Sequence, residues 1–376
     1  MVSVLQWNCR GFRSNFEELK LLIREYDPAC ICLQELILGV NYPFLLPPTS
    51  YISYTSHHRG INGRGGAGLL IRNSLHSDAI FLQTQLHAVA AKVILSRPYS
   101  LCSLYLPPSE AVSYKDLEDV IKQLQPPIIL VGDFNIRHPM WGDTSTSPNA
   151  NIVVDLITKH NLVCMNSGAP THYHQASQSF THIDISLCSN IISQSLIWSR
   201  LDDLHGSDHY PIVISEMGTD SSLDSPSRWC FRRADWALFR DATKIFKSPL
   251  SFPSIDKALE YFLDVVIKAS ENSIPRVMPS SKPRVPWWNP ECREAIRERK
   301  KALRRFHRTK CSEDFIKYKL FKTKARRTLR VTRRAYTENF LSSLNSSIPT
   351  NVMYKRIRRF VHHNDYNHPT VLRYGD

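Results

Sequence analysis

This 376-residue sequence has no long hydrophobic run, since no window approaches the roughly 18 uninterrupted apolar residues that a membrane-spanning helix needs. Its first residues enter an apolar strand-like run directly, without the basic stretch and apolar segment of a secretory signal. We therefore expect an intracellular protein that is neither secreted nor inserted into a membrane.

The spacing of zinc ligands is also missing. The nine cysteines include no Cys-x-x-Cys, and no Cys and His residues are spaced as zinc sites require. Cys30 and Cys32 alternate along an apolar run, as buried strand residues do. We interpret the cysteines as core thiols of a reducing compartment.

Basic residues are scarce in the first part of the chain. Residues 1–216 hold 14 Lys and Arg against 18 Asp and Glu, a balance of −4, although the whole chain carries +14. The remaining residues hold 34 against 16, a balance of +18. A basic tail attracts phosphate backbones through counterion release, whereas the alternative is a solvated charged face. Because the excess is so one-sided, we favour nucleic-acid binding.

The length and the 42% hydrophobic content are sufficient for two soluble domains. Up to residue 216 short apolar runs alternate with stretches of helical periodicity, which is typical of an α/β fold with two sheets packed face to face and flanked by helices. A polar, turn-rich linker at 217–227 is predicted to separate this domain, 1–216, from a segment at 228–376. We expect strands within 2–7, 29–33, 68–71, 88–95, 101–106, 128–131, 184–187 and 211–215, and helices around 16–23, 117–124 and 153–157.

The basic segment 228–376 is predicted to be mainly α-helical. Asn289 can cap a helix that has Pro290 at its first position, and Ser312 starts a second helix after a polar turn. Apolar residues recur at steps of four in the second helix, which predicts an antiparallel hairpin with a cationic outer surface. That surface is expected to include Lys322 and the nucleic-acid-binding candidates Arg326, Arg327, Arg330, Arg333 and Arg334.

Charged and amide side chains stand at the ends of the predicted strands. Asn8 comes directly after the apolar run 2–7, and Glu35 follows the run 29–33 by two positions. Asp184 lies within the run 183–187. The segments 132–135 and 207–212 each place a carboxylate beside a second polar group after an apolar run. A sheet delivers charged side chains to its rim in this way, so the set predicts one hydrolytic metal site.

This ordered set resembles the motif series of the endonuclease/exonuclease/phosphatase superfamily. Phrases at 7–11, 64–68, 105–108 and 133–142 are similar to the endonuclease domains of jockey-type non-LTR retrotransposons, and 229–236 and 286–292 look like the segment before their reverse transcriptase. The resemblance implies a four-layer α/β sandwich followed by the basic helical segment. The matching residues are Asn8, Gln34, Glu35, Tyr105, Asp133, Asn135, Asp184, Asp208 and His209.

The resemblance also implies a divalent metal at these residues. Magnesium prefers hard oxygen ligands and keeps several waters, and Mn²⁺ can substitute for it. Glu35 is the first candidate ligand, whereas Asn8 and Asp208 lie in the family's metal neighbourhood and bind directly or through water.

The remaining matched residues are candidates for catalysis. Asp133, with Asn135 orienting water or phosphate, either activates the nucleophile or protonates the leaving oxygen. His209, held by Asp184, either donates to a phosphate oxygen or accepts a proton. Tyr105 hydrogen-bonds the scissile phosphate or, in the competing interpretation, is a rim aromatic that closes the core.

The expected function is nicking of one strand of target DNA in the nucleus, which leaves a 3′ hydroxyl to prime reverse transcription. No Ala-Asp-Asp, the paired-aspartate signature of a reverse transcriptase, occurs in the sequence, so we expect that domain in cis or in trans, and the basic tail offers a site for element RNA. The alternatives are another phosphoesterase of this fold (an abasic-site repair nuclease, a deadenylase or a lipid or inositol phosphatase) or a nucleic-acid-binding element remnant that does not cut.

Overall fold

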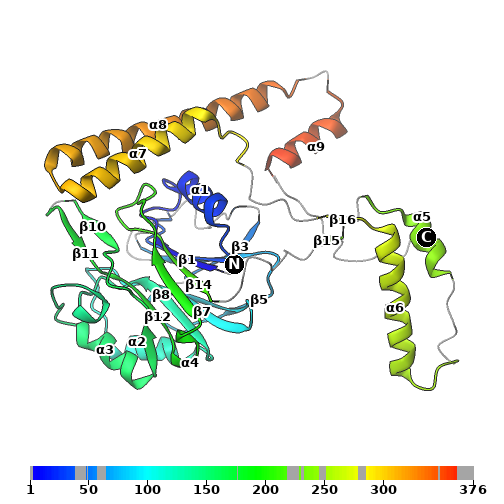
Figure 1. Cartoon of the computed structure of the whole chain (residues 1–376), viewed down its shortest axis with the longest axis horizontal. Helices are drawn as coiled ribbons and strands as arrows, with labels where there is room; N and C mark the ends of the chain where they lie inside the picture. Colours follow the sequence, from blue (N-terminus) through cyan, green and yellow to red (C-terminus); the bar gives the residue numbers. More distant parts are fainter. Residues whose placement is uncertain are drawn as a thin grey trace. The chain divides into compact units, whose positions relative to one another are not determined.

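The computed structural model describes residues 3–38, 48, 50–56, 65–175, 177–217, 228–229, 233–244, 251–277, 285–345 and 348–361. Within these ranges the chain forms two six-stranded sheets with helices on their outer faces (Figure 1). The predicted linker 217–227 lies outside the described residues except for Met217, and so do 230–232 and 362–376 of the predicted helical segment.

The two large sheets contain most of the strands. The first sheet comprises β1 (Ser3–Asn8), β2 (Cys30–Gln34), β3 (Tyr51–Thr55), β4 (Ala67–Arg72), β13 (Leu196–Arg200) and β14 (Ile212–Glu216). The second comprises β5 (Ser77–Ile80), β6 (His87–Ile94), β7 (Pro98–Tyr105), β8 (Ile128–Asp133), β9 (Leu162–Cys164) and β12 (Asp184–Ser189). Short pairs are formed by β10 (His172–His174) with β11 (Ser179–Thr181) and by β15 (Arg228–Trp229) with β16 (Arg276–Val277).

Helices lie between many of the strands and make up the end of the described chain. They are α1 (Phe16–Tyr26), α2 (Tyr114–Lys122), α3 (Ala150–Lys159), α4 (Asn190–Ser193), α5 (Trp236–Thr243), α6 (Ile255–Ser273), α7 (Pro290–Thr309), α8 (Ser312–Ser342) and α9 (Thr350–Val361), with a 3₁₀ turn η2 (Pro139–Trp141). None of them, among the residues described, combines the length and the apolar composition needed to span a bilayer.

Both large sheets mix parallel and antiparallel pairing. The strand order is β13-β14-β1-β2-β4-β3 in the first sheet, where β1 and β2 are parallel. It is β5-β6-β7-β8-β12-β9 in the second, where β7 and β8 are parallel. Each predicted strand is present. The strands that were not predicted are β3, β5, β9 and β13 at the sheet edges, where an exposed face weakens the apolar pattern, and the short strands β10, β11, β15 and β16.

Three apolar clusters produce four layers. Cys32 of the first sheet and Leu101 of the second belong to one buried cluster, which lies between the sheets. Leu22 of α1 packs on the outer face of the first sheet, and Leu117 of α2 with Val153 of α3 packs on the outer face of the second. The predicted four-layer α/β sandwich is therefore confirmed.

The chain divides into two compact units. One, within Thr219–Ser281, holds β15, α5, α6 and β16; the other holds all elements from β1 to β14 together with α7, α8 and α9. The boundaries at 216 and 228 stay predictions. The basic helical tail, however, is not one body, because its second part groups with the sandwich.

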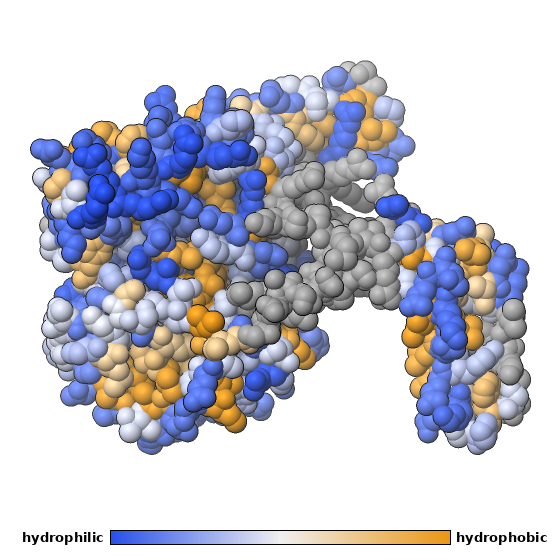
Figure 2. Space-filling model, in the orientation of Figure 1, coloured by the Kyte–Doolittle hydropathy of each residue, from blue (hydrophilic) through white to orange (hydrophobic). Residues whose placement is uncertain are grey.

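Helices α7 and α8 form the predicted antiparallel hairpin and lie side by side in Figure 1. The cap is the expected one, since Asn289 Oδ1 accepts a hydrogen bond from the Cys292 backbone N–H at 2.9 Å. Hydrophilic side chains gather on the visible surface of the hairpin (Figure 2). The hairpin prediction is thus correct in its elements and in the polarity of the face that points to solvent.

Two apolar clusters attach the hairpin to the sandwich. Leu21 of α1 packs with Ile296 of α7 and Leu329 of α8. Tyr210, which precedes β14, packs with Phe306 of α7 and Phe315 of α8. The sandwich therefore covers part of the apolar surface of the hairpin.

A buried ion triad joins the same two parts. Arg299 of α7 is 1% exposed; its guanidinium donates to both carboxylate oxygens of Glu18 on α1, at 2.5 and 3.1 Å, and to Asp203 Oδ2 at 2.7 Å. Burial opposes ionisation of both acids, but the charge of Arg299 outweighs it and lowers the pKa of Glu18 and of Asp203. A planar guanidinium is suited to this bidentate geometry.

The prediction for Lys322 is wrong. The side chain does not lie on the outer surface: it is half-buried and its Nζ donates to the Ser207 carbonyl oxygen at 2.9 Å. The reason is helical spacing, because Tyr318, Lys322, Ala325 and Leu329 follow one another at steps of three and four and share the face that packs on the sandwich.

Candidate active site

The predicted site residues meet at one end of the sandwich. In the second sheet Asp133 of β8 is paired with Tyr105 of β7 and with Asp184 of β12. In the first sheet Asn8 of β1 is paired with Gln34 of β2. Asn8 Nδ2 donates to Asp133 Oδ2 at 2.8 Å and so links the two sheets at this end. Sheet order and register, rather than nearness in sequence, bring these side chains together.

The backbone at two strand ends is unusual. Glu35 has φ 52° and Asn135 has φ 51°, values in the left-handed region that non-glycine residues seldom adopt. Gly132 tolerates no side chain, because a Cβ there would lie 1.9 Å from the Leu104 carbonyl oxygen of β7. The Gly-Asp-x-Asn phrase therefore has a structural basis: the glycine permits close approach of two strands, and the left-handed turn returns the Asn135 amide to within 3.3 Å of Asp133 Oδ2.

Asp133 is a buried acid surrounded by donors. Its Oδ2 accepts from Asn8, and its Oδ1 accepts from the Asn135 backbone N–H at 3.0 Å. Burial raises the pKa of Asp133 to about 7, with His209 opposing the rise and Asp184 adding to it. A carboxyl group that titrates near neutrality can accept or release a proton at physiological pH.

His209 stands between two acids. Its Nδ1 lies 2.8 Å from Asp184 Oδ2, and its Nε2 lies 3.8 Å from Asp133 Oδ2. Burial disfavours the charged ring, but Asp184, Asp133 and Asp208 outweigh burial and raise the pKa of His209 to about 10. The imidazole is therefore protonated near neutrality. Its Nδ1 donates to Asp184, and its Nε2 proton is available to an oxygen placed in the site.

Asp208 approaches from the turn before β14. Its carboxylate forms an ion pair with Arg10 and lies 4.0 Å from His172 Nε2. Burial raises the pKa of Asp208, but His209, Arg10 and His172 together lower it below its usual value. These neighbours therefore favour the ionised form of the Asp208 carboxyl group.

Arg10 and His172 are site residues to which the sequence pattern assigned no role. Arg10 lies two residues after Asn8, so nearness to the motif was an available signal. His172 gave none: its ring packs against that of His209 at a tilt of 40°, with centroids 4.4 Å apart, because an isolated β-bridge pairs the two residues across 37 positions of chain. A contact of this kind depends on the folded topology.

Glu35 lies at the rim and is only partly buried. Burial raises the pKa of Glu35 and Asp208 adds to the rise, while His209 and a hydrogen bond with Asn8 oppose it. Neighbouring carboxylates that raise one another's pKa are stabilised by a divalent cation. The Glu35 and Asp208 carboxylates and the Asn8 amide oxygen, which accepts a hydrogen bond from the Arg10 backbone N–H at 3.0 Å, are hard donors of the kind that magnesium prefers.

Two further groups of three side chains have ligand atoms within 4.8 Å of one another: Asp133, Asp184 and His209, and His172, Asp208 and His209. Both contain His209, whose imidazole binds a metal only when neutral. Both groups are candidate ligand sets beside the oxygens of Glu35, Asn8 and Asp208.

Tyr105 lies at the end of β7 and is buried, while its proposed phosphate contact stays a prediction. It belongs to the core cluster between the sheets and is 7% exposed. Burial raises the pKa of Tyr105, and Glu35 and Asp133 raise it further, so the hydroxyl keeps its proton. Gly65 leaves room for the ring, because a Cβ there would lie 3.2 Å from it at φ +83°. The phenol thus closes the core and remains a hydrogen-bond donor.

The five candidate arginines of α8 differ in their partners. Arg326 donates to Asn15 Oδ1 at 3.0 Å, and Arg333 pairs with Glu17 at 2.7 Å. Arg334 pairs with Glu338 along the helix at 2.7 Å. Arg327 and Arg330 are exposed, with no ion pair among the residues that the structure describes. The structure brings none of the five into the Asp133–His209 site.

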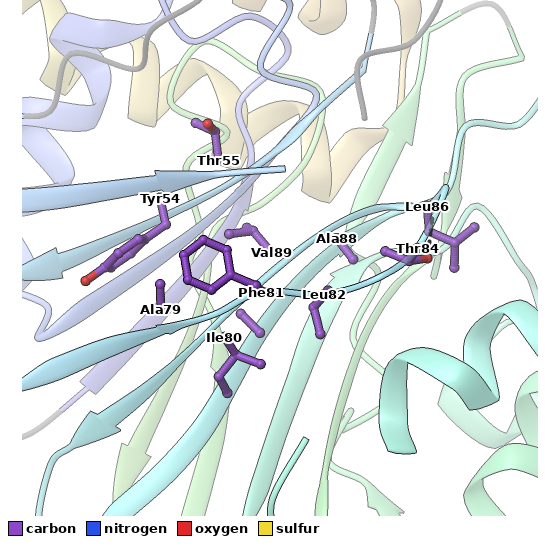
Figure 3. Close-up of a pocket in the computed structure, with 11 residues that line it drawn as sticks. Tyr54, Thr55, Ala79, Ile80, Phe81, Leu82, Thr84, Leu86, Ala88 and Val89 are labelled. Carbon is purple, nitrogen blue, oxygen red and sulfur yellow. Dashed lines mark hydrogen bonds between the residues drawn. The ribbon is translucent and has the colours of Figure 1, made fainter. Parts of the chain in front are cut away.

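An apolar pocket lies elsewhere, between β3 and the segment from β5 to β6 (Figure 3). Its lining includes Tyr54, Phe81 and Leu86 and contains no charged residue. None of the predicted site residues contributes to it. We therefore assign the chemistry to the polar rim described above.

Comparisons with known proteins find similar sequences among proteins of mobile elements. Residues 99–213 match the family described as Endonuclease-reverse transcriptase. The chain is 24% identical over 278 residues to the RNA-directed DNA polymerase from mobile element jockey of Drosophila melanogaster, covering 72% of this chain and 30% of that protein. It is 27% identical over 243 residues to the probable RNA-directed DNA polymerase from transposon X-element of the same species, covering 63% and 26%. The corresponding jockey protein of Drosophila funebris is 23% identical over 367 residues, covering 94% and 39%.

The chain spans 26 to 39% of the length of these relatives. Among solved structures, the endonuclease domain of TRAS1, a telomere-specific non-LTR retrotransposon, superposes with a TM-score of 0.50 at 19% identity, covering 57% of this chain and 97% of that domain. The predicted resemblance and the predicted fold are both confirmed.

Proposed function

We propose that this chain, whose sandwich is an endonuclease-like domain related to those of jockey-type non-LTR retrotransposon proteins, is a metal-dependent endonuclease that nicks one strand of duplex DNA. The supporting observation is the placement of His209 between Asp133 and Asp184, with Asn8 hydrogen-bonded to Asp133 from the other sheet. A buried acid that titrates near neutrality, beside a protonated imidazole, supplies a proton-transfer group and a positive charge for a phosphodiester.

The reaction is hydrolysis of the bond between phosphorus and the 3′ oxygen. Water adds its oxygen to phosphorus, the P–O3′ bond breaks, and a proton ends on the departing 3′ oxygen. Asp133 takes the proton from water or supplies one to the 3′ oxygen, and Asn135 orients the group that approaches it. The cut strand carries a 3′ hydroxyl and a 5′ phosphate.

His209 and Tyr105 are proposed to stabilise the phosphate as its charge develops. Asp184 engages Nδ1 of His209, so the protonated ring directs its Nε2 toward Asp133 and toward an oxygen placed in the site. The Tyr105 hydroxyl is protonated and adds a second, neutral donor. Fixed donors of this kind stabilise a transition state because they need no reorganisation during the reaction.

Glu35, Asn8 and Asp208 are proposed to hold a magnesium ion, or manganese in its place, which supplies charge neutralisation at the phosphate when bound. Of the predicted ligands, Glu35 and Asp208 contribute carboxylates and Asn8 an amide oxygen.

DNA is the proposed substrate because the relatives are described as RNA-directed DNA polymerases of mobile elements. A nick that leaves a 3′ hydroxyl provides the primer that such a polymerase needs, which suggests target-primed reverse transcription in the nucleus. The exposed arginines of α8 are proposed to add contacts to DNA or to element RNA.

The test is nicking of supercoiled plasmid by the full chain with magnesium and then with EDTA. We expect open circles only with the metal. Asp133→Asn should remove the activity, whereas Asp155→Asn, an exposed acid of α3, should retain it. A chain that leaves plasmid intact but hydrolyses an abasic duplex, poly(A) or an inositol phosphate would be another phosphoesterase of this fold. Binding of DNA without hydrolysis of any of these would indicate a non-catalytic remnant.

A further inference from the structure

We propose that the α7–α8 hairpin supports the active site from outside, with Lys322 of α8 as a positioning residue for the turn that carries Asp208 and His209. This inference rests on the proposed nuclease function and extends it, because it gives the hairpin a part in positioning the catalytic residues of the sandwich. Lys322 acts through the backbone of this turn.

The first step is the contact that Lys322 makes. Its Nζ donates to the Ser207 carbonyl oxygen at 2.9 Å. The Ser207 hydroxyl in turn donates to the Asn8 carbonyl oxygen at 2.7 Å and accepts from the His209 backbone N–H at 3.2 Å. Ser207 therefore ties the end of β1 to the start of the catalytic turn, and Lys322 holds Ser207 from outside.

A second contact comes from the next turn of the same helix. Arg326, four residues after Lys322 and so on the same face, donates to Asn15 Oδ1 at 3.0 Å. Asn15 Nδ2 donates to the Cys9 carbonyl oxygen at 2.7 Å, directly after Asn8. One face of α8 thus holds both segments that supply the site, the end of β1 through Asn15 and the catalytic turn through Ser207.

The hairpin is fixed firmly enough to act in this way. The triad of Arg299 with Glu18 and Asp203 is buried, and Asp203 lies four residues before Ser207. On the other side of the turn, the Tyr210 hydroxyl and His307 Nε2 lie 2.6 Å apart. The catalytic turn is therefore held by α7 before and after it and by Lys322 in its middle. A side chain whose neighbours are this constrained has a defined position.

The competing role for Lys322 is a direct phosphate contact, as for an exposed lysine of a basic helix. The two roles predict different kinetics. Loss of a phosphate contact weakens DNA binding, whereas a displaced His209 slows the chemical step at saturating DNA, because small misplacements of catalytic groups cost about 10²-fold.

The experiment compares the full chain with Lys322→Met, Lys322→Arg and Lys319→Met. Lys319 is an exposed lysine of α8 and serves as the matched control. Hydrogen–deuterium exchange of the metal-free protein reports the segment 204–210, and single-turnover nicking at saturating DNA reports the chemistry. Lys322→Gln, which is polar and one bond shorter, replaces Lys322→Met if the latter fails to fold.

We expect Lys322→Met to speed exchange of 204–210 and to lower the saturated rate about 10- to 100-fold with unchanged half-saturation. Lys322→Arg, which keeps a donor, should restore both, and Lys319→Met should alter neither. Unchanged exchange and rate, or weaker DNA binding at an unchanged saturated rate, would overturn the proposal. If the wild-type chain cuts no DNA, the proposed function fails, but the exchange comparison still decides whether Lys322 positions the turn.

Discussion

The catalytic end of the sandwich and the interface between the sandwich and α7–α8 are both built from residues far apart in the chain, yet only the first could be recognised from sequence. Each catalytic residue belongs to a short phrase, such as the Gly-Asp-x-Asn around Asp133. At the interface Arg299 is hydrogen-bonded to Glu18, 281 positions away, and Arg326 to Asn15, 311 positions away. None of these four residues belongs to a recognisable sequence motif. A motif is recognisable where the backbone conformation restricts which residues fit, as at Gly132 and Asn135. A contact between two packed surfaces imposes no such restriction on the neighbouring sequence.

The pKa values of buried acids shift in opposite directions in the two regions. At the catalytic end, burial raises the pKa of Asp133 to about 7, so ionisation of this acid in the folded state is unfavourable. At the interface, Arg299 more than compensates burial and lowers the pKa of Glu18 and Asp203. We infer that ionised Asp133 lowers the free energy of unfolding while it serves catalysis. Glu18 and Asp203, paired with Arg299, raise the free energy of unfolding. This contrast can be tested one substitution at a time.

The largest effect is expected from Asp133→Asn. Nicking by the full chain should fall by about 10² to 10⁴, the range for loss of a proton-transfer group. The free energy of unfolding should be unchanged or higher at pH 8, because a buried carboxylate above its raised pKa is replaced by a neutral amide of similar shape. Plasmid nicking and urea unfolding measure the two quantities. Retained nicking would contradict the catalytic role of Asp133, and a lower free energy of unfolding would contradict the view that its ionised form destabilises the fold.

Arg299→Met should show the reverse pattern. The free energy of unfolding should drop by about 3 to 5 kcal/mol, because the change leaves two carboxylates buried without their cation. Arg297→Met on the same helix removes an exposed pair with Glu294 and should cost about 1 kcal/mol or less. Equal losses in the two variants would show that the triad does not anchor the hairpin.

Acid should weaken the interface in a predictable direction. The folded-state pKa of Glu18 and of Asp203 is lowered, so the unfolded chain binds more protons, and their contribution is complete above about pH 4 and lost as the pH falls below it. Burial, Arg299 and nearby His205 are the main influences on both acids.

Glu18→Gln tests this linkage. The variant should be less stable than wild type at pH 7, and the gap should narrow below pH 4 by up to about 1.4 kcal/mol per pH unit. Other carboxylates contribute equally to both proteins and cancel in the difference. Urea unfolding at a series of pH values supplies the data, and a gap that stays constant from neutral to acid would contradict the assignment.

Periodicity and composition predicted the sandwich, its strands and both hairpin helices because these depend on local apolar patterns. The matched motifs predicted residues that the fold does bring together, such as Asp133, Asp184 and His209. The side chain of Lys322 was assigned to the wrong face, since an apolar stripe read at steps of four drifts around a helix of 3.6 residues per turn. His172 was missed because its contact arises from a single β-bridge. Long-range pairing of this kind has no signature in one sequence.

The smallest effect concerns the outward face of α8, and it separates arginines that are paired with an acid from arginines that are available to nucleic acid. Arg327 and Arg330 are exposed and form no ion pair among the residues described, whereas Arg333 and Arg334 pair with Glu17 and Glu338. If the free charges meet phosphates, Arg327→Gln/Arg330→Gln should reduce the slope of log affinity against log salt by about one unit per lost contact. Arg333→Gln/Arg334→Gln should change the slope less, because those cations are already partly neutralised.

Fluorescence anisotropy of a labelled duplex with the full chain in EDTA measures binding without cleavage. The free energy of unfolding should change by less than about 0.5 kcal/mol in both variants. Identical slopes in wild type and both variants would mean that the hairpin binds no nucleic acid, and that its basic face serves the fold alone.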